Sequence, residues 1–422
     1  AREKLDFLHT TKFSEITFAN ITPDKRNNWL NQPENNWDDL IPLGNKETKL
    51  GTGKGKQQAI FKLFSLGVAT NRDDWVYDFN VNSLIEKNTF FINFYNSESI
   101  RWQNSDKKEA INDFVDRTIK WTSELEAHLK KKSGLQFNSD LIRRASYRPF
   151  VSLHFYYDRI IVHRTYQQTE FFPIGKSVEN KLIAVSGLNT AKGICILASD
   201  QIVDLHFNGD SQCFPIYRYS ANGERIENIT DWALGIFQKH YKDKKITKED
   251  IFHYVYAVLY HPTYREKYAK NLKDELPKIP YYKSFWQWAD WGKQLLDLHL
   301  NYEQVEPYPL TREDKDGEKL RKAITPRLMA RKEQGVIEID TLTTLRGVPP
   351  EAWQYRLGTY TALEWVLERY KEKEPKDATI REKFNTYKFA DYKEQVIDLL
   401  MRVCTVSVET MKIIAQMPEE DN

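Results

Sequence analysis

The sequence has few cysteines and no long apolar run. Cys195, Cys213 and Cys404 lie far apart, and no CxxC pair occurs. This spacing argues against a disulfide framework and against a cysteine-based zinc site, and it fits a cytoplasmic, reducing environment. No run of about 18 apolar residues occurs and the N-terminus lacks the apolar core of a signal peptide, so we expect neither a membrane span nor a secretory leader.

An excess of charge of one sign is also missing. The 62 Lys and Arg residues are balanced by 60 Asp and Glu, which leaves a formal net charge of +2. No global field therefore indicates a nucleic-acid partner, and a DNA-binding protein of this composition must gather its basic residues on one face. With 13% aromatic residues, we expect large aromatic cores and a few exposed rings for base stacking.

The familiar catalytic motifs are absent. A phosphate-binding GxxxxGK[ST] loop does not occur, because Lys54 and Lys56 are followed by Gly and Gln,. An adenine methyltransferase needs an Asp/Asn-Pro-Pro-Tyr/Phe loop, and Pro349-Pro350 stand between Val348 and Glu351 instead,. The sequence therefore predicts no catalytic residue.

A nuclease of the PD…(D/E)xK kind remains an alternative. Pro23-Asp24 precedes Glu47-Thr48-Lys49, which is the required order of residues. The carboxylates of such a site lie on paired strands, whereas both segments here are polar and rich in Asn or Gly. This alternative is therefore the least favoured.

The most regular pattern lies between Ile246 and Pro280. Thr247 and Asp250 have the spacing of a helix cap, and His261-Pro262 interrupts the helical pattern that follows,. A second helix is expected to begin at Pro262 and to end before Pro277. The apolar face of the first helix comprises Ile251, Tyr254, Val255, Val258 and Leu259,.

Four stretches, in this order, resemble the C-terminal specificity region of Type ISP restriction–modification enzymes and related single-chain restriction enzyme/adenine methyltransferases. They are GVATNRDDWVYDF (67–79), RASYRPFVSLHFYYD (144–158), DIFHYVYAVLYHPTYREKYAKNLKDELPKIP (250–280), and YRLGTYTALEWVLERYK (355–371) with LLMRVCTVSVETMKII (399–414). The resemblance implies a target-recognition region, normally preceded by nuclease, helicase-like and adenine-methyltransferase parts. Because the chain starts without Met, we expect it to be the end of a longer protein.

The expected fold class is α+β, with a central antiparallel β-rich recognition unit, a helical N-terminal connector and a largely helical C-terminal unit. We expect a connector to an upstream methyltransferase part (1–56), an α/β segment with a long helix (57–139), a β-rich target-recognition unit (140–245) and a mostly helical unit (246–422). Within these units, periodicity predicts helices over 104–132, 350–370 and 387–416, and a strand over 336–345,.

Two groups of polar residues on predicted turns and strand ends are candidates for DNA contacts. Thr70, Asn71 and Arg72 form a polar turn between apolar segments, unless Arg72 pairs with Asp73 or Asp74 on a solvated turn,. An arginine cluster with an aromatic neighbour suits phosphates or guanine edges. This cluster consists of Arg143, Arg144, Tyr147 and Arg148, and Asp140 and Asp158 are the alternative partners of its first two arginines.

Two further segments are candidates. The loop at 186–193 carries Asn189, Thr190 and Lys192, which are capable of groove contacts, although a hairpin connection without a partner is equally consistent. The densest basic run, 319–332, includes Lys322, Arg327 and Arg331 and contains no acid. It predicts either a phosphate clamp or a solvated face.

Asp204 and His206 raise the question of a metal. Together with Asp200 and Asp210 they have a spacing that fits no metal motif, so a hydrogen-bonded histidine is favoured over a ligand,. No metal or cofactor is expected in this chain. The resemblance implies that S-adenosylmethionine, ATP and Mg²⁺ belong to other domains.

The leading hypothesis is sequence-specific recognition of double-stranded DNA, which positions the DNA for adenine methylation and ATP-dependent cleavage by other domains. The expected partners are double-stranded DNA and the methyltransferase and helicase/nuclease domains of the same enzyme. The alternative is a scaffold that docks those domains without reading bases.

Overall fold

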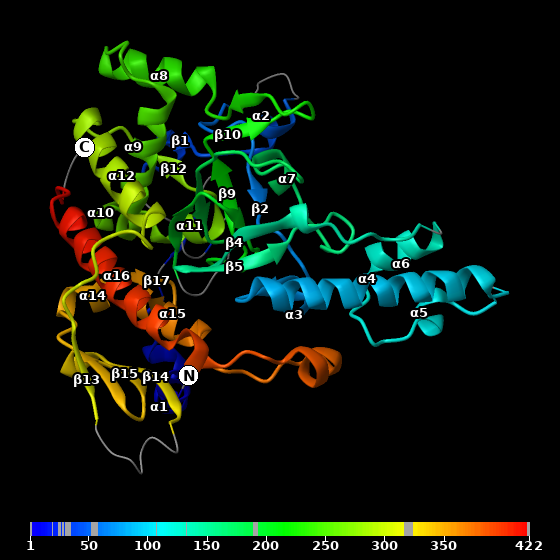
Figure 1. Ribbon diagram of the computed structural model, residues 1–422. Coiled ribbons are helices and arrows are strands. Elements are labelled where there is room, and N and C mark those ends of the chain that lie inside the picture. Colours follow the sequence, from blue (N-terminus) through cyan, green and yellow to red (C-terminus); the bar gives the residue numbers. More distant parts are fainter. Residues whose placement is uncertain are drawn as a thin grey trace.

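The structure is a computed structural model that describes residues 2–18, 20–23, 27, 29, 35–51, 58–106, 108–131, 133–188, 193–315 and 324–419 (Figure 1). Its described part combines helices with several small, mainly antiparallel sheets, which confirms the predicted α+β class. One buried hydrophobic cluster extends from Trp37 to Met417. In the ranges given above, no helix has both the length and the apolarity needed to cross a bilayer.

The N-terminal segment begins with an exposed helix and pairs with the rest of the chain through β1. α1 buries no residue, and Phe13 and Phe18 are 78% and 68% exposed. β1 pairs with β12 (Lys278–Ile279) near the C-terminal helices. The elements are α1 (Arg2–Thr10), η1 (Phe13–Glu15), η2 (Trp37–Asp39), β1 (Ile41–Pro42) and α2 (Lys46–Leu50).

The second segment contains a helical arm, made of α4, α5 and α6, that projects from the body (Figure 1). The long helix predicted at 104–132 is wrong, because the long helix is α4 and it ends where the predicted one begins. Asp116 accepts the Thr118 N–H at 2.7 Å, and the Thr122 side chain caps α6, so polar side chains take up backbone donors and break the helical pattern,. The elements are β2 (Ser65–Leu66), α3 (Asp73–Val76), β3 (Tyr77–Asp78), α4 (Val81–Asn104), α5 (Ile111–Phe114) and α6 (Ser123–Lys130).

Two four-stranded sheets form the centre, where the sequence predicts one antiparallel β-rich unit. Their strand orders are β3-β5-β4-β8 and β2-β9-β6-β7, and only the β4–β8 pair is parallel. The elements are η3 (Ser139–Leu141), β4 (Ile142–Arg148), β5 (Val151–Tyr156), α7 (Gln168–Phe171), β6 (Leu182–Val185), β7 (Ile196–Ser199), β8 (Ile202–Val203), β9 (Gln212–Pro215), β10 (Tyr217–Tyr219) and β11 (Arg225–Glu227).

α9 and α12 make up the helical core beside these sheets. The predicted cap is confirmed, since Thr247 and Asp250 form a capping box at the start of α9. All residues from Ile251 to Tyr260 are buried, so α9 is enclosed on every side. Gly292 permits this packing, because a Cβ there would lie 1.7 Å from the His253 carbonyl oxygen. The elements are α8 (Asp231–Tyr241), α9 (Lys248–Tyr260), α10 (Pro262–Lys267), α11 (Ala269–Asp274), β12 (Lys278–Ile279) and α12 (Phe285–Leu300).

The C-terminal unit contains a sheet that the sequence pattern did not reveal. Its strand order is β13-β16-β15-β14, and the single strand predicted at 336–345 is wrong, because β15 and β16 form a hairpin there. The single helix predicted at 350–370 is also wrong. A β17–β18 hairpin turning at Gly358 (φ 69°) divides that stretch, and Thr361 caps the helix that follows,.

The helical prediction at 387–416 is confirmed by α16, which runs along this unit (Figure 1). The elements are β13 (Thr311–Asp314), β14 (Pro326–Arg331), η4 (Lys332–Gln334), β15 (Val336–Asp340), β16 (Thr343–Arg346), α14 (Pro350–Gln354), β17 (Arg356–Leu357), β18 (Tyr360–Thr361), α15 (Ala362–Arg369), the π-helical η5 (Ile380–Phe384) and α16 (Phe389–Ala415).

Candidate nucleic-acid interface

Arg143 and Arg144 lie on β4 with accessible side chains. Arg143 Nη1 donates to the Lys176 carbonyl oxygen at 2.5 Å, and Arg144 Nη2 lies 3.7 Å from Glu303 Oε1. The alternative prediction, in which these arginines pair with Asp140 and Asp158, is therefore wrong. Arg144 is 42% exposed and its one acidic neighbour is also exposed, so the ion pair is weak and its guanidinium can exchange that carboxylate for a phosphate.

A polar row crosses the sheet beside Arg144. In the strand register Arg144 is opposite His154 on β5, and His154 is opposite Asp78 on β3. Burial and then the charge of Arg144 lower the pKa of His154, so its ring is neutral at pH 7. A neutral imidazole both donates and accepts hydrogen bonds, as a base-edge contact requires.

Arg148 belongs to a buried network. Its Nη1 lies 2.6 Å from Asp204 Oδ1, and its guanidinium faces the Tyr147 ring at 3.9 Å. Tyr77 donates to the other oxygen of Asp204 at 3.2 Å. Burial raises the pKa of Asp204 to about 6, although the Arg148 guanidinium opposes the rise. The Arg148 side chain is only 10% exposed, so an exposed basic cluster is wrong for this residue.

Tyr147 links that network to the polar turn at 70–73. Its hydroxyl donates to Asp73 Oδ2 at 3.1 Å, and Arg148 Nη2 lies 4.0 Å from the same oxygen. The Thr70 hydroxyl donates to the other Asp73 oxygen. Two of the predicted segments, far apart in the sequence, are therefore brought together through Asp73.

The prediction that the polar turn offers its side chains to DNA is wrong for two of its three residues, because they are buried. Thr70 and Arg72 are 2% and 3% exposed, and only Asn71 is exposed, with a left-handed φ of 54°. Arg72 donates from Nη2 to Thr122 Oγ1 at 2.8 Å. Its hydrogen-bond partner is thus not Asp73 or Asp74, as the alternative interpretation had it.

Arg327 and Arg331 lie on a different sheet, on the edge strand β14. Both guanidiniums contact Glu338 of β15 at 3.1 Å, and both side chains are close to half exposed. Hydrogen bonds from Arg331, with a smaller effect from Arg327, hold the pKa of Glu338 below its ordinary value. The described end of the basic run therefore faces a carboxylate from the neighbouring strand.

Some of the predicted positions cannot be placed. Asn189, Thr190, Lys192 and Lys322 lie outside the described residues, although the strands β6 and β7 around the first three pair as a hairpin, as expected. Asp24 of the nuclease alternative also lies outside them. Glu47 and Lys49 of that alternative are on a helix, α2, rather than a strand.

A metal site has no support in the described ranges, where no group of three or more His, Cys, Asp or Glu residues could hold a metal ion. Asp204 instead pairs with Arg148. His206 Nδ1 lies 3.2 Å from Asp210 Oδ1, a contact that agrees with the interpretation of a hydrogen-bonded histidine.

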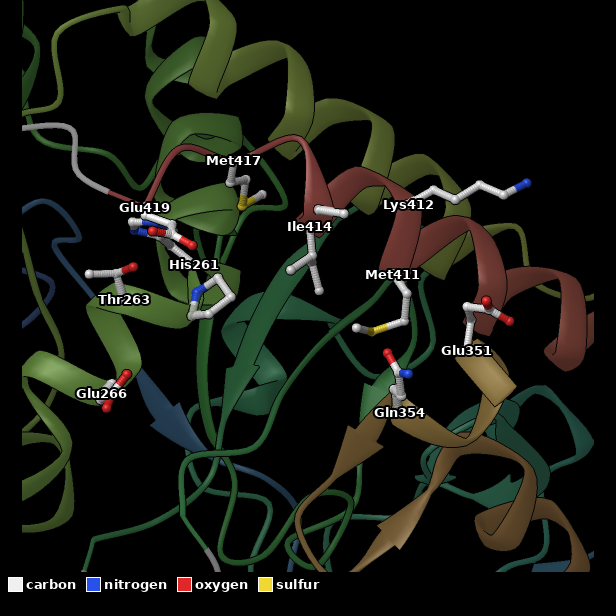
Figure 2. A pocket seen from close by; sticks show the side chains of 12 residues that line it. His261, Thr263, Glu266, Glu351, Gln354, Met411, Lys412, Ile414, Met417 and Glu419 are labelled. Carbon is white, nitrogen blue, oxygen red and sulfur yellow. The ribbon is translucent and has the colours of Figure 1, made fainter. Parts of the chain in front are cut away.

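A hollow of about 730 Å³ lies elsewhere, between α10, α14 and the end of α16 (Figure 2). Glu266, Glu351 and Glu419 line it with Lys412 as the only Lys or Arg, so its charge is wrong for a DNA phosphate. His261 is held there by the Tyr282 hydroxyl at 2.9 Å and the Pro418 carbonyl at 2.8 Å. Of the predicted contact residues that the structure describes, none lines this hollow.

Comparison with known proteins identifies the chain. A family model described as the Type ISP C-terminal specificity domain matches residues 59–399. The chain belongs to this family. No curated protein matches this Type ISP specificity domain.

Solved structures agree with the family. The DrdV–DNA complex determined by cryo-EM has 47% identity to the Type ISP domain described here and a TM-score of 0.89, and the match covers 99% of this chain and 42% of that one. A nuclease-deletion mutant of the Type ISP restriction-modification enzyme LlaGI, in complex with a DNA substrate mimic, has 28% identity and a TM-score of 0.81 over 100% and 38% of the two chains.

The third neighbour is the ATP-dependent Type ISP restriction-modification enzyme LlaBIII bound to DNA. It has 26% identity and a TM-score of 0.78, over 97% of this chain and 26% of that one. The chain therefore spans less than half the length of each of these three neighbours.

Proposed function

We propose that this chain recognises a specific sequence in double-stranded DNA as the specificity domain of a Type ISP restriction–modification enzyme. One observation carries the proposal: the family match over residues 59–399 coincides with the same fold in a DNA complex at 47% identity. In this proposal the domain positions DNA for adenine methylation and ATP-dependent cleavage by methyltransferase and helicase/nuclease domains. S-adenosylmethionine, ATP and Mg²⁺ would be bound by those domains, and the free, buried cysteines fit a cytoplasmic protein,.

Accessible groups on the face of β4 support this assignment. Arg144 on β4 and the neutral His154 opposite it on β5 offer one charged and one uncharged hydrogen-bonding group. Phosphate contacts supply affinity that depends on salt, and base-edge contacts supply sequence preference. A chain with a net charge of only +2 must obtain its DNA affinity from such local groups.

Substitution of the two accessible arginines tests the proposal. In Arg143→Ala/Arg144→Ala, each lost phosphate contact makes the plot of log affinity against log salt shallower by about 0.9. An arginine that reads guanine contributes about 1–3 kcal/mol of preference for the correct base. Fluorescence anisotropy of a specific and a scrambled duplex at several salt concentrations measures both effects.

Lys239→Ala/Lys244→Ala is the matched control, because it also removes two exposed positive charges but on and after α8. We expect the control to bind as wild type does. If both double variants lost DNA affinity equally, only the net charge of the chain would matter. That result would contradict recognition through β4.

A scaffold that docks other domains without reading bases is the second candidate. The observation in its favour is that several predicted contact residues already have partners within the chain: Arg72, Arg148, Arg327 and Arg331. For a scaffold, neither arginine substitution on β4 would alter DNA binding.

A further inference from the structure

A small polar hollow lies where the arm meets the segment before η5. Three parts of the chain converge there: Thr379 Oγ1 donates to the Thr118 carbonyl at 2.6 Å, and Trp75 Nε1 donates to Asp377 Oδ2 at 2.8 Å. In Figure 1 the orange segment that contains η5 extends in the same direction as α4. The hollow has a volume of about 230 Å³ and is lined by Asn71, Arg72, Asp73, Asp74, Trp75, Lys120, Lys376 and Asp377.

Arg72 is the buried cation of this hollow. Its guanidinium lies 5.1 Å from the centre of the Phe91 ring and donates through Nη2 to Thr122. Nε and Nη1 are buried and have no hydrogen-bond partner among the described residues. Burial lowers the pKa of Arg72 to about 10, so the group is still charged at neutral pH. A buried guanidinium with two open donors needs an acceptor.

Two exposed lysines, Lys120 and Lys376, contribute further positive charge. Neither ammonium forms an ion pair or hydrogen bond in the part of the chain that the structure describes. They come from different segments, one preceding α6 and the other preceding η5. The charge of Glu124 acts on Arg72, whereas the two lysines have no ion-pair partner among the described residues.

The carboxylates in the hollow have other partners. Asp377 accepts hydrogen bonds from the Ile380 N–H at 3.1 Å and from Trp75. Asp73 accepts from Thr70 and Tyr147. Burial raises the pKa of Asp74, and the neighbouring carboxylates raise it further. Asp377 and Asp73 therefore accept hydrogen bonds from within the chain, and the ionised form of Asp74 is less favourable. The two lysines, in contrast, have no such partner among the described residues.

We propose that this hollow binds one backbone phosphate of duplex DNA, which Lys120 and Lys376 contact together and which the buried charge of Arg72 attracts. The inference rests on the proposed function and adds a contact site at the base of the arm, away from the accessible arginines of β4. Ammonium groups offer only donors, and an oxyanion with several acceptor oxygens satisfies both lysines at once. The contact fixes the position of the DNA without reading its sequence.

The test uses duplex binding by the whole chain and the double variant Lys120→Ala/Lys376→Ala, which leaves the buried Arg72 intact. One phosphate contact steepens the plot of log affinity against log salt concentration by about 0.9. At 0.1 M salt this contact strengthens DNA binding about eightfold. Because both lysines contact the same phosphate, we expect the double variant to lose about one phosphate contact and not two. Lys239→Ala/Lys244→Ala is again the charge-matched control, and Arg72→Lys is a conservative second variant.

We expect the lysine variant to have a plot of log affinity against log salt that is shallower by about one. Its affinity should fall equally for specific and scrambled duplexes, and the control should bind as wild type does. Unchanged binding by the lysine variant, with wild type binding normally, would overturn the phosphate site and leave the proposed function intact. A higher melting temperature in inorganic phosphate, lost in the lysine variant without any loss of DNA binding, would identify a free-anion site and contradict the DNA assignment. A wild-type chain that binds no duplex would instead contradict the proposed function.

Discussion

Removal of the Asp204 carboxylate should destabilise the protein strongly, because it leaves Arg148 buried without its closest acid. Asp204 is 2% exposed and accepts from Arg148 at 2.6 Å, from Tyr77 at 3.2 Å and from the His206 N–H at 2.9 Å. Breaking a buried ion pair by deleting one partner costs about 3–5 kcal/mol. Asp73, 4.0 Å from Arg148, still offers some compensation, so we expect Asp204→Ala to lower the free energy of unfolding by about 3 kcal/mol.

Urea unfolding followed by tryptophan fluorescence measures this loss, with Asp210→Ala as the control. The Asp210 side chain is 67% exposed beside His206, and because its backbone has a left-handed φ of 48°, its removal should change the free energy of unfolding by about 1 kcal/mol or less. The double variant Asp204→Ala/Arg148→Met removes both charges and should be more stable than Asp204→Ala alone. A loss below about 1 kcal/mol in the single variant, or a double variant that is less stable than the single one, would refute the reasoning.

Two further predictions concern packing and pH. Gly292→Ala places a Cβ 1.7 Å from the His253 carbonyl oxygen, so we expect a loss of about 1–3 kcal/mol by urea unfolding. Gly235→Ala, with open space around the new Cβ on exposed α8, should be neutral or stabilising,. Burial alone would raise the pKa of Asp340, but the Lys393 ammonium at 2.7 Å and two backbone N–H groups lower it overall. Its contribution to stability should therefore be present at neutral pH and disappear as the pH falls below about 4. Unfolding of wild type and Asp340→Asn as a function of pH should converge in acid, and a constant difference between them would contradict this assignment.

Local signals in the sequence predicted several elements correctly. The Thr247–Asp250 capping box and the Pro262 break depend on neighbouring residues, so both were visible without the structure. Short runs of β-branched and aromatic residues likewise indicated the strands β5, β6, β7 and β8,. The helix predicted at 104–132 failed because side chains such as Asp116 and Thr122 capture backbone N–H groups there, and apolar periodicity does not register that competition,.

The candidate interface was less predictable, since its side chains depend on distant partners. Arg148 and Asp204 are 56 residues apart, and Tyr147 reaches Asp73 across 74 residues. Arg327 and Arg331 lie within a run without acids, yet the neighbouring strand places Glu338 against both. A pattern of arginines shows where positive charge is available but not which guanidinium is already paired. The sequence indicated Asp73 only as a partner of Arg72, and Glu303 carried no signal as a partner of Arg144.

The central claim is that this domain reads a DNA sequence, and selection from a pool of random duplexes tests it most directly. The wild-type chain retains duplexes at several salt concentrations, and the retained sequences are determined after each round. We predict enrichment of one defined motif, with retention that weakens as salt rises. Salt-sensitive retention without any enriched motif would contradict sequence recognition and would leave a domain that only contacts phosphates.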